Sequence, residues 1–231
     1  MLINAKKTLC ILVVVIALKS SLAQNATTII TTPQQLRKSV QQDINKKYVD
    51  IRQIIPDIKI DLRYGSTNNF TNSILYNQPV PFLRLPAATA LKQVQNELHQ
   101  HGMGLLIYDA YRPLSVTKKI WTFVKDSRYA ANPVTGSGHN RGIAVDLTII
   151  DLKTGKTIDM GTDFDNFSDS SGHQFLQLPQ SVLKNRRKLK GVMIKAGFKA
   201  LDTEWWHYAW NNDRGYELTD IDFRQMGIAI K

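Results

Sequence analysis

Two short segments constrain the fold of this 231-residue chain more than any other part of it, because both carry side chains that bind metal ions. The segments offer two histidines, an aspartate and a glutamate: His139 and Asp146 within 137–146 (SGHNRGIAVD), and Glu204 and His207 within 202–208 (DTEWWHY). Two imidazoles and one carboxylate would fill three positions of a tetrahedral Zn²⁺ and leave the fourth for water, as in catalytic zinc sites. We therefore expect a fold that brings these two distant segments together.

The local pattern around each segment favours such a meeting. His139 lies on a turn that ends at Gly142, and the strand predicted after this glycine can carry Asp146 back to the same point. Glu204 and His207 are three positions apart, so both can point the same way from a tight turn or a short helix. In this arrangement Glu204 is not needed as a ligand and can act as a base.

Each of these residues also has a purely structural explanation. A single histidine such as His139 or His207 is more often a hydrogen-bonded structural residue than a ligand, and Glu204 could be a surface charge beside two tryptophans. Asp146 could cap a turn, and Arg112, in the DAYRP segment, could pair with an aspartate. No short His-Glu-x-x-His motif is present, so the spacing alone does not establish a metal site.

The N-terminus has the features of a secretory signal peptide. Two lysines precede an apolar run over 9–18, and the small residues Ser21 and Ala23 are placed for cleavage after Ala23. The run is too short to cross a bilayer comfortably, so we expect no integral membrane span after cleavage and a periplasmic or secreted product; an uncleaved anchor is the alternative. The only cysteine, Cys10, lies in this leader, so the mature chain would contain no disulfide.

We expect three parts in the chain: a signal peptide over 1–23, a polar N-terminal arm over 24–47 and one catalytic domain over 48–231. The arm is rich in Thr, Gln and Lys and has little apolar periodicity, whereas the rest is long enough for one buried core. Within the domain the apolar patterns predict strands and helices. The expected strands are 58–64, 104–108 and 143–149, and the expected helices are 86–102, one after Pro113, and one through 184–190.

The formal net charge of +11 makes polyanions a class of partner to consider. The densest basic run, 184–190, lies among apolar residues that recur at helical spacing, so we interpret these charges as the solvated face of a helix. A patch for nucleic acid or another anionic polymer is the alternative. Because no aromatic residues lie between the charges, we expect no nucleic-acid partner.

Taken together, these segments resemble a known family. The pattern Ser-x-His-x-x-Gly-x-Ala-x-Asp over 137–146, with Glu-Trp-Trp-His over 204–207, is similar to the zinc D-alanyl-D-alanine dipeptidases of the VanX type, in peptidase family M15. The resemblance covers about residues 48 to 210. Further landmarks of that family occur in the same order: DLRY at 61–64, DAYRP at 109–113, MGTDFD at 160–165 and NRR at 185–187.

The resemblance implies an α+β fold, in which a small antiparallel sheet is flanked by helices, as in zinc DD-peptidases and hedgehog-like proteins. It also implies one Zn²⁺ per subunit, bound by His139, Asp146 and His207. Glu204 would be the general base, and Arg112 would stabilise the transition state.

The implied reaction is zinc-dependent hydrolysis of the D-Ala-D-Ala dipeptide. Asp165 would receive the ammonium group of the substrate, Ser137 would contact the dipeptide and Tyr64 would help to close a small cavity. Two alternatives stay open. One is a D,D-carboxypeptidase or endopeptidase that acts on peptidoglycan stem peptides, which export and a basic surface would suit. The other is a non-catalytic metal- or cell-wall-binding protein, against which the presence of Glu204 argues.

Overall fold

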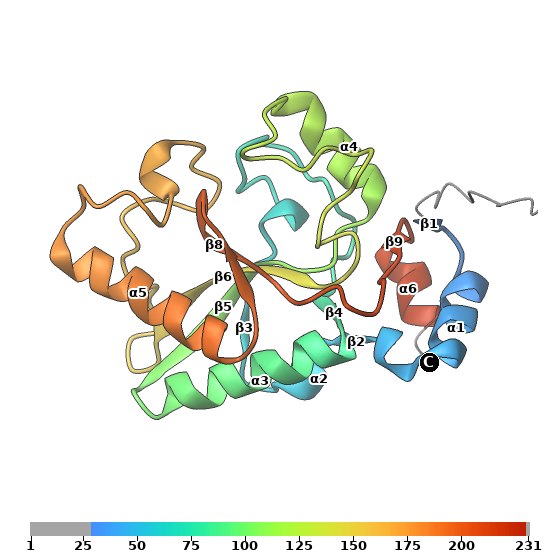
Figure 1. Cartoon of the computed structure of the whole chain (residues 1–231), viewed down its shortest axis with the longest axis horizontal. Coiled ribbons are helices and arrows are strands. Elements are labelled where there is room, and N and C mark those ends of the chain that lie inside the picture. Colours follow the sequence, from blue (N-terminus) through green and yellow to red (C-terminus); the bar gives the residue numbers. More distant parts are fainter. Residues whose placement is uncertain (1–28, 230–231) are drawn as a thin grey trace, which may run out of the picture.

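A computed structural model describes residues 29–229, and a five-stranded sheet lies at its centre (Figure 1). The strands lie in the order β3 (Lys59–Ile60), β5 (Met103–Asp109), β6 (Ala144–Asp151), β8 (Glu204–Ala209) and β7 (Lys199–Leu201). Neighbouring strands are antiparallel except β3 and β5, which pair in parallel. The expected α+β class is confirmed, but the sheet is mixed rather than wholly antiparallel, because a helical crossover connects β3 to β5.

The strand β6 shows which face of the sheet is apolar and which carries polar side chains. Val145, Leu147 and Ile149 are fully buried in the main apolar cluster, and they alternate with Asp146 and Thr148. Because successive side chains of a strand point to opposite faces, both polar residues lie on the other side of the sheet. One face of the sheet therefore forms the core, and the other holds a buried carboxylate.

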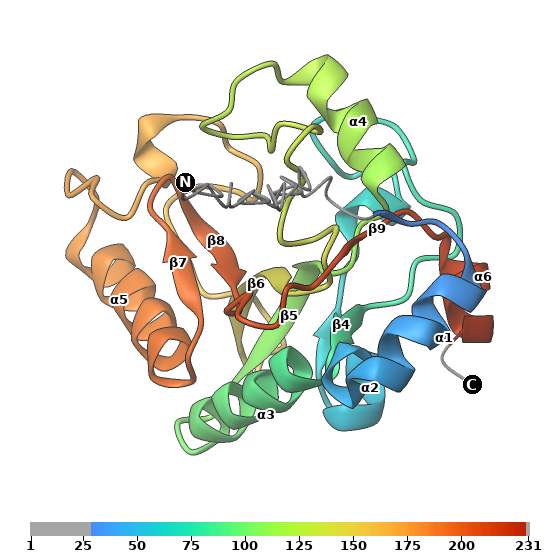
Figure 2. The ribbon, with the colours of Figure 1, turned by 45° about the vertical axis from the view of Figure 1, so that its right-hand side comes forward.

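Two helices cover the apolar face, namely α3 (Leu85–His99) and α5 (Gln180–Lys195), which lie side by side in Figure 2. Leu98 of α3 and Leu189 of α5 are fully buried in the same cluster as β6. Of the basic run on α5, Lys184 and Arg187 are exposed. Arg186 is the exception, because it is buried and donates hydrogen bonds to backbone carbonyls of the loop over 160–172.

The remaining elements surround this centre. On the side opposite to α3 in Figure 1 lies the helix α4 (Leu114–Phe123). The other strands form two small sheets: β2 (Tyr48–Asp50) with β4 (Phe82–Arg84), and β1 (Ile29–Ile30) with β9 (Leu218–Thr219). The other helices are α1 (Pro33–Gln42), α2 (Ile51–Ile54) and α6 (Phe223–Ala229), with 3₁₀ turns η1 (Ile44–Lys46), η2 (Arg63–Gly65) and η3 (Asp169–Ser171).

The segment 29–47 differs from the polar arm that the sequence suggested. Thr32 and Gln35 form a capping box that starts α1, and Leu36 is buried. The helix packs against α6, while β1 pairs in parallel with β9. The partners of this segment lie at the opposite end of the chain. No local sequence pattern therefore indicates that its short apolar face is buried. The predicted signal peptide, 1–23, lies outside the described residues.

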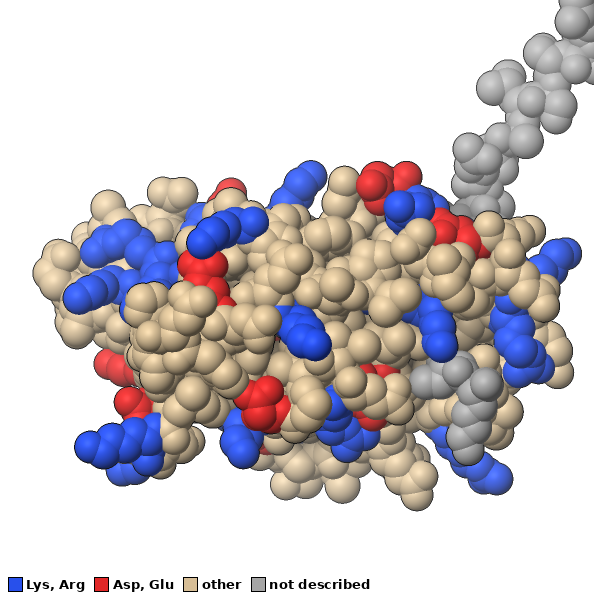
Figure 3. All heavy atoms as spheres, turned by 90° about the horizontal axis from the view of Figure 1, so that it is seen from below, with Lys and Arg blue, Asp and Glu red and all other residues tan. Residues whose placement is uncertain are grey.

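One face of the described part of the chain carries a mixture of basic and acidic side chains (Figure 3). On the face seen in Figure 3, lysines and arginines are scattered and acidic residues lie among them. This distribution is in keeping with the interpretation of the basic run as a solvated helix face. Between residues 29 and 229, no helix combines the length and the apolar character needed to cross a bilayer.

Gly142 allows the turn after His139 to pack against the core. Its φ is +68°, in the left-handed region, and a Cβ at this position would lie 2.1 Å from Cε1 of Tyr48. Tyr48 is fully buried beneath the guanidinium of Arg84, which lies 4.0 Å from the ring centroid, so the ring has little room to move. The turn therefore requires a residue without a side chain.

We expect Gly142→Ala to lower the free energy of unfolding by about 2 to 5 kcal/mol, as the sum of left-handed strain and overpacking against Tyr48. Urea denaturation measures this change. Gly155→Ala is a matched control, because Gly155 has a φ of +69° and nothing within 4 Å of the added Cβ. That variant should lose only about 1 to 2 kcal/mol. Equal losses in both variants would show that the contact with Tyr48 is unimportant.

Candidate active site

The sheet and one turn bring the two chemically informative segments together. β6 pairs with β8 in a register that places Asp146 directly opposite His207. The turn before β6 returns the chain to the same point, because the amides of Gly142 and Ile143 donate to the carbonyls of His139 and Gly138, respectively. His139 therefore reaches both Asp146 and His207.

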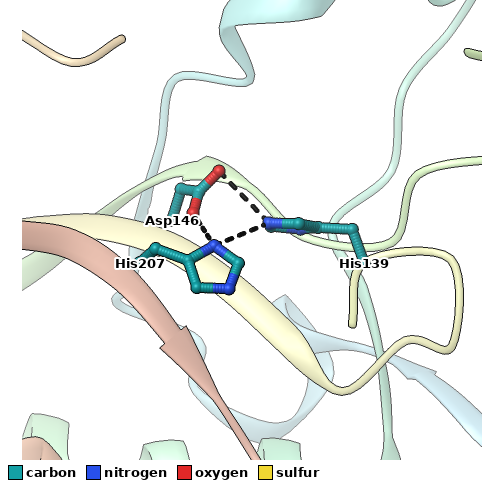
Figure 4. A group of neighbouring side chains, drawn as sticks. All are labelled: His139, Asp146 and His207. Carbon is teal, nitrogen blue, oxygen red and sulfur yellow. Dashed lines mark hydrogen bonds and ion pairs between the residues drawn. The ribbon is translucent and has the colours of Figure 1, made fainter. Parts of the chain in front are cut away.

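His139, Asp146 and His207 point toward one another (Figure 4). Asp146 Oδ2 lies 3.3 Å from His139 Nε2, Asp146 Oδ1 lies 2.9 Å from His207 Nδ1, and the two imidazole nitrogens are 3.2 Å apart. In residues 29–229 this is the only group of three or more candidate metal ligands whose ligand atoms all lie within 4.8 Å of one another. The arrangement is that of three donors directed at a common centre.

The surroundings of these residues fit a zinc ion. His139 Nδ1 lies 2.7 Å from the carbonyl oxygen of Ala110, and donation to this carbonyl leaves Nε2 as a free lone pair that faces the cluster. Burial alone would raise the pKa of Asp146, but His139 and His207 outweigh it and hold the pKa of this carboxyl well below its usual range. Two neutral imidazoles and an ionised carboxylate are a donor set that zinc prefers.

Glu204 is the first residue of β8, so the prediction of a tight turn or a short helix at this point is wrong. In a regular strand Glu204 and His207 would face opposite sides. The pairing with β7 is irregular, however, because Ala200 lies opposite Tyr208 whereas Leu201 lies opposite Glu204. This bulge directs both side chains into the site, and Glu204 Oε2 lies 4.0 Å from His207 Nδ1.

The environment of Glu204 is suited to proton transfer. Its side chain is buried, and this burial raises the pKa of the carboxyl well above its usual value; the neighbouring carboxylates of Asp146 and Asp165 raise it further. A carboxyl whose pKa is shifted toward neutrality can both accept and return a proton.

Arg112 projects into the site from the segment after β5, where it is buried. Its Nε and NH2 groups donate to Asp109 Oδ2 at 2.8 and 2.6 Å, and NH2 lies 3.8 Å from Asp146 Oδ2. The hydroxyl of Tyr76 donates to the second oxygen of Asp109 at 2.5 Å. Arg112 therefore does pair with an aspartate, and this pairing holds its guanidinium beside the three candidate ligands.

The three expected substrate contacts line the same cavity, which measures about 270 Å³. Asp165 has a φ of +59°, which is strained for a residue with a side chain, and it accepts a hydrogen bond from the Tyr64 hydroxyl at 2.9 Å. Burial raises the pKa of Asp165 well above its usual value, and Asp146 raises it further. Ser137 Oγ accepts a hydrogen bond from the amide of His139. The structure thus brings together all eight residues that the sequence predicted for the site.

Sequence reasoning missed Asn140, which is fully buried beside His139. Its side-chain amide donates to the carbonyl of Arg112 and to the hydroxyl of Thr117, both at 2.8 Å, and its side-chain oxygen accepts from the amide of Ser137 at 2.9 Å. Asn140 therefore fixes the turn of His139 to the segment of Arg112. In the sequence, the only indication of this structural role is that a polar residue occurs inside the segment 137–146.

The other three histidines lie outside the cavity. His99 pairs with Asp57 at 2.9 Å on the surface, and His101 is exposed. His173 packs near the ring of Tyr208, and burial lowers the pKa of His173 to about 4. None of the three lies with the candidate ligands.

A group of metal-ligand type, with a carboxyl and an arginine beside it in one small cavity, is typical of a metal-dependent hydrolase. The family model of the D-ala-D-ala dipeptidases, Peptidase_M15, matches residues 44–225, and the chain belongs to this family. It is therefore an enzyme of the metallopeptidase class. This agrees with the resemblance found in the sequence.

Several curated relatives match most of the chain. D-alanyl-D-alanine dipeptidase of Escherichia coli K12 is 35% identical over 175 residues, which are 76% of this chain and 90% of the relative. The dipeptidase of Enterococcus faecium is 29% identical (74% and 94% covered), and that of Streptomyces coelicolor is 32% identical (68% and 88%). Among solved structures, the LdcB LD-carboxypeptidase aligns with a TM-score of 0.40 and 17% identity, over 73% of this chain and 70% of that one.

Proposed function

We propose that this enzyme hydrolyses the D-Ala-D-Ala dipeptide with one zinc ion per subunit. The observation that carries the proposal is the meeting of His139, Asp146 and His207 with Glu204 and Arg112 in one cavity of about 270 Å³. The names of the curated relatives support the substrate. A cavity of this size suits a dipeptide with two small side chains rather than a cross-linked wall fragment.

His139, Asp146 and His207 would hold the zinc ion. When bound there, zinc supplies Lewis-acid polarisation of the scissile carbonyl and acidifies water. The carboxyl of Glu204 accepts the proton of the attacking water and returns it to the nitrogen of the leaving amine. Since Glu204 is buried beside the ligands without being needed as one, its carboxyl is free for this proton transfer.

Arg112 stabilises the negative charge that develops on the carbonyl oxygen during attack. Its guanidinium is already fixed by Asp109 and shielded from water, so little reorganisation is needed when the charge forms. This preorganisation makes a buried donor more effective than a mobile surface cation.

Groups at the edges of the cavity recognise the two ends of the substrate. We assign the ammonium group to Asp165, whose carboxyl is oriented by Tyr64, and a contact with the dipeptide to Ser137. A peptide that places its ammonium group against the half-buried Asp165 gains a charge-assisted contact beside the Tyr64 hydroxyl, which favours it over peptides without that contact. The leader predicted over 1–23 supports export of this activity to the periplasm or the medium, where peptidoglycan fragments would supply the dipeptide.

Release of free D-Ala by the purified, zinc-loaded protein tests the proposal. We expect turnover of D-Ala-D-Ala and little or none of L-Ala-L-Ala, which has the same composition and charges but the opposite stereochemistry. A zinc-loaded protein that releases no D-Ala from the dipeptide would refute the substrate assignment, and longer peptidoglycan stem peptides would then be tested.

A further inference from the structure

We propose that Tyr129 and Phe167 form a side-chain wall that restricts the catalytic cavity to dipeptides by separating it from a second groove. This inference rests on the proposed function, and it assigns the length limit of the substrate to two residues that the catalytic steps do not use.

The second groove, which we call the outer groove, measures about 380 Å³ and lies directly beside the catalytic cavity. Arg128 and Tyr129 line both spaces. At two other places, one residue lines the catalytic cavity and the next residue in the chain lines the outer groove. Phe167 and Leu201 line the catalytic cavity, whereas the residues that follow them, Ser168 and Asp202, line the outer groove. The partition is therefore only about one residue thick.

Two aromatic side chains contribute to this partition, beside Arg128 and the main chain at 167–168 and 201–202. The rings of Tyr129 and Phe167 have centroids 5.5 Å apart, and Phe167 also packs edge-on against Phe70 at 4.9 Å. Tyr129 and Phe167 are half-buried, and no hydrogen bond of either side chain occurs among the described residues. The two rings can be removed by substitution without loss of a side-chain hydrogen bond, while the contact of Thr203 Oγ1 with the carbonyl of Arg128, at 3.0 Å, is kept.

The wall lies on the side where a longer peptide would extend. Under the proposed function Asp165 binds the ammonium group, and Phe167 follows it two residues later in the same loop. Since Phe167 and Tyr129 line the same cavity as Asp165, we place an additional residue at the amino end of the peptide against their rings. Beyond them the outer groove presents the exposed carboxylates of Asp169 and Asp202, which suit a basic side chain or a free amino group.

The test compares D-Ala-D-Ala with L-Lys-D-Ala-D-Ala in the double variant Tyr129→Ala/Phe167→Ala. In both substrates water adds across the D-Ala-D-Ala amide and frees D-Ala, so one assay serves for both. We expect the wild type to cleave the dipeptide and reject the tripeptide. The double variant should cleave the tripeptide with a kcat/KM at least about 10-fold above that of the wild type, because the steric block is gone.

Phe123→Ala is the matched control. Phe123 is an exposed aromatic residue that packs on Phe70 at 6.3 Å and lines neither space, so its removal should leave both activities unchanged. A double variant that still rejects the tripeptide, or a wild type that accepts it as well as the dipeptide, would overturn the proposal.

A binding measurement separates this proposal from the proposed function. Calorimetric titration of L-Lys-D-Ala-D-Ala into zinc-loaded Glu204→Gln protein, with and without the wall substitutions, reports access to the cavity when no turnover occurs. We expect binding only after the wall is removed. If no protein releases D-Ala from the dipeptide, the proposed function fails while this titration still decides on the wall; equal affinities with and without the wall would refute it.

Discussion

Glu204→Gln is expected to reduce kcat for D-Ala release by about 10²- to 10⁴-fold while one zinc ion per chain stays bound. Glutamine preserves the shape and hydrogen-bonding capacity of the side chain but cannot take up the proton of the attacking water. The side chain is buried at the edge of the cavity and lies 4.0 Å from His207, so the metal ligands themselves are unchanged. Steady-state kinetics and metal analysis of the same preparation measure both quantities.

Glu97→Gln is the control for the loss of a carboxylate. Glu97 lies on α3 and pairs with Lys195 at 2.9 Å, on the opposite side of the sheet from the cavity, so kcat should not change. Wild-type kcat in Glu204→Gln would mean that another group is the base. If neither the wild type nor Glu204→Gln released D-Ala and both bound zinc equally well, the protein would be better described as a non-catalytic metal-binding protein.

The chemistry of the site could be predicted from the sequence because it depends on residue types in two short segments. The chain has only five histidines, and the pattern of 137–146 already favours a turn followed by a strand. The structure places His139, Asp146 and His207 together, with Asp146 and His207 on paired strands. The assigned functions of these residues stay predictions that the experiments above address.

The conformation around Glu204 could not be predicted in the same way. A separation of three residues is compatible with a helical turn, and the sequence alone favoured that explanation. The strand β8 forms instead because it pairs with β6 on one side and with β7 on the other, and the bulge opposite Ala200 appears only in that pairing. Tertiary pairing therefore determined the local structure, as is common for short segments.

Features that depend on distant contacts were also absent from the sequence-based predictions. The helix α1 is stabilised by α6, and Asn140 is explained by acceptors in the segment of Arg112 and in α4. Likewise, the rings of Tyr129 and Phe167 come from two loops whose approach no local pattern indicates. In each case the sequence itself is ordinary, and only the contact with a distant segment shows what the residues do.

Removal of zinc with a chelator is expected to abolish D-Ala release and to lower the melting temperature, and added Zn²⁺ should restore both. The three proposed ligands come from the turn and two strands of the folded chain, so we expect zinc to bind the native state in preference to the unfolded one. At free zinc about 100-fold above its dissociation constant, this linkage adds about 2.7 kcal/mol to the free energy of unfolding. Calorimetric scans at several zinc concentrations measure the shift.

His139→Ala and His99→Ala distinguish this site from weak binding by surface histidines. His139 is buried among the ligands, so its removal should abolish both turnover and the zinc-dependent shift in melting temperature. His99 pairs with Asp57 on the surface and lies outside the cavity, so its removal should change neither. Mg²⁺ should not replace Zn²⁺, because two of the three donors are imidazole nitrogens, which Mg²⁺ binds poorly. A zinc-dependent shift that persists in His139→Ala would place the ion elsewhere and remove the basis for the proposed role of Glu204.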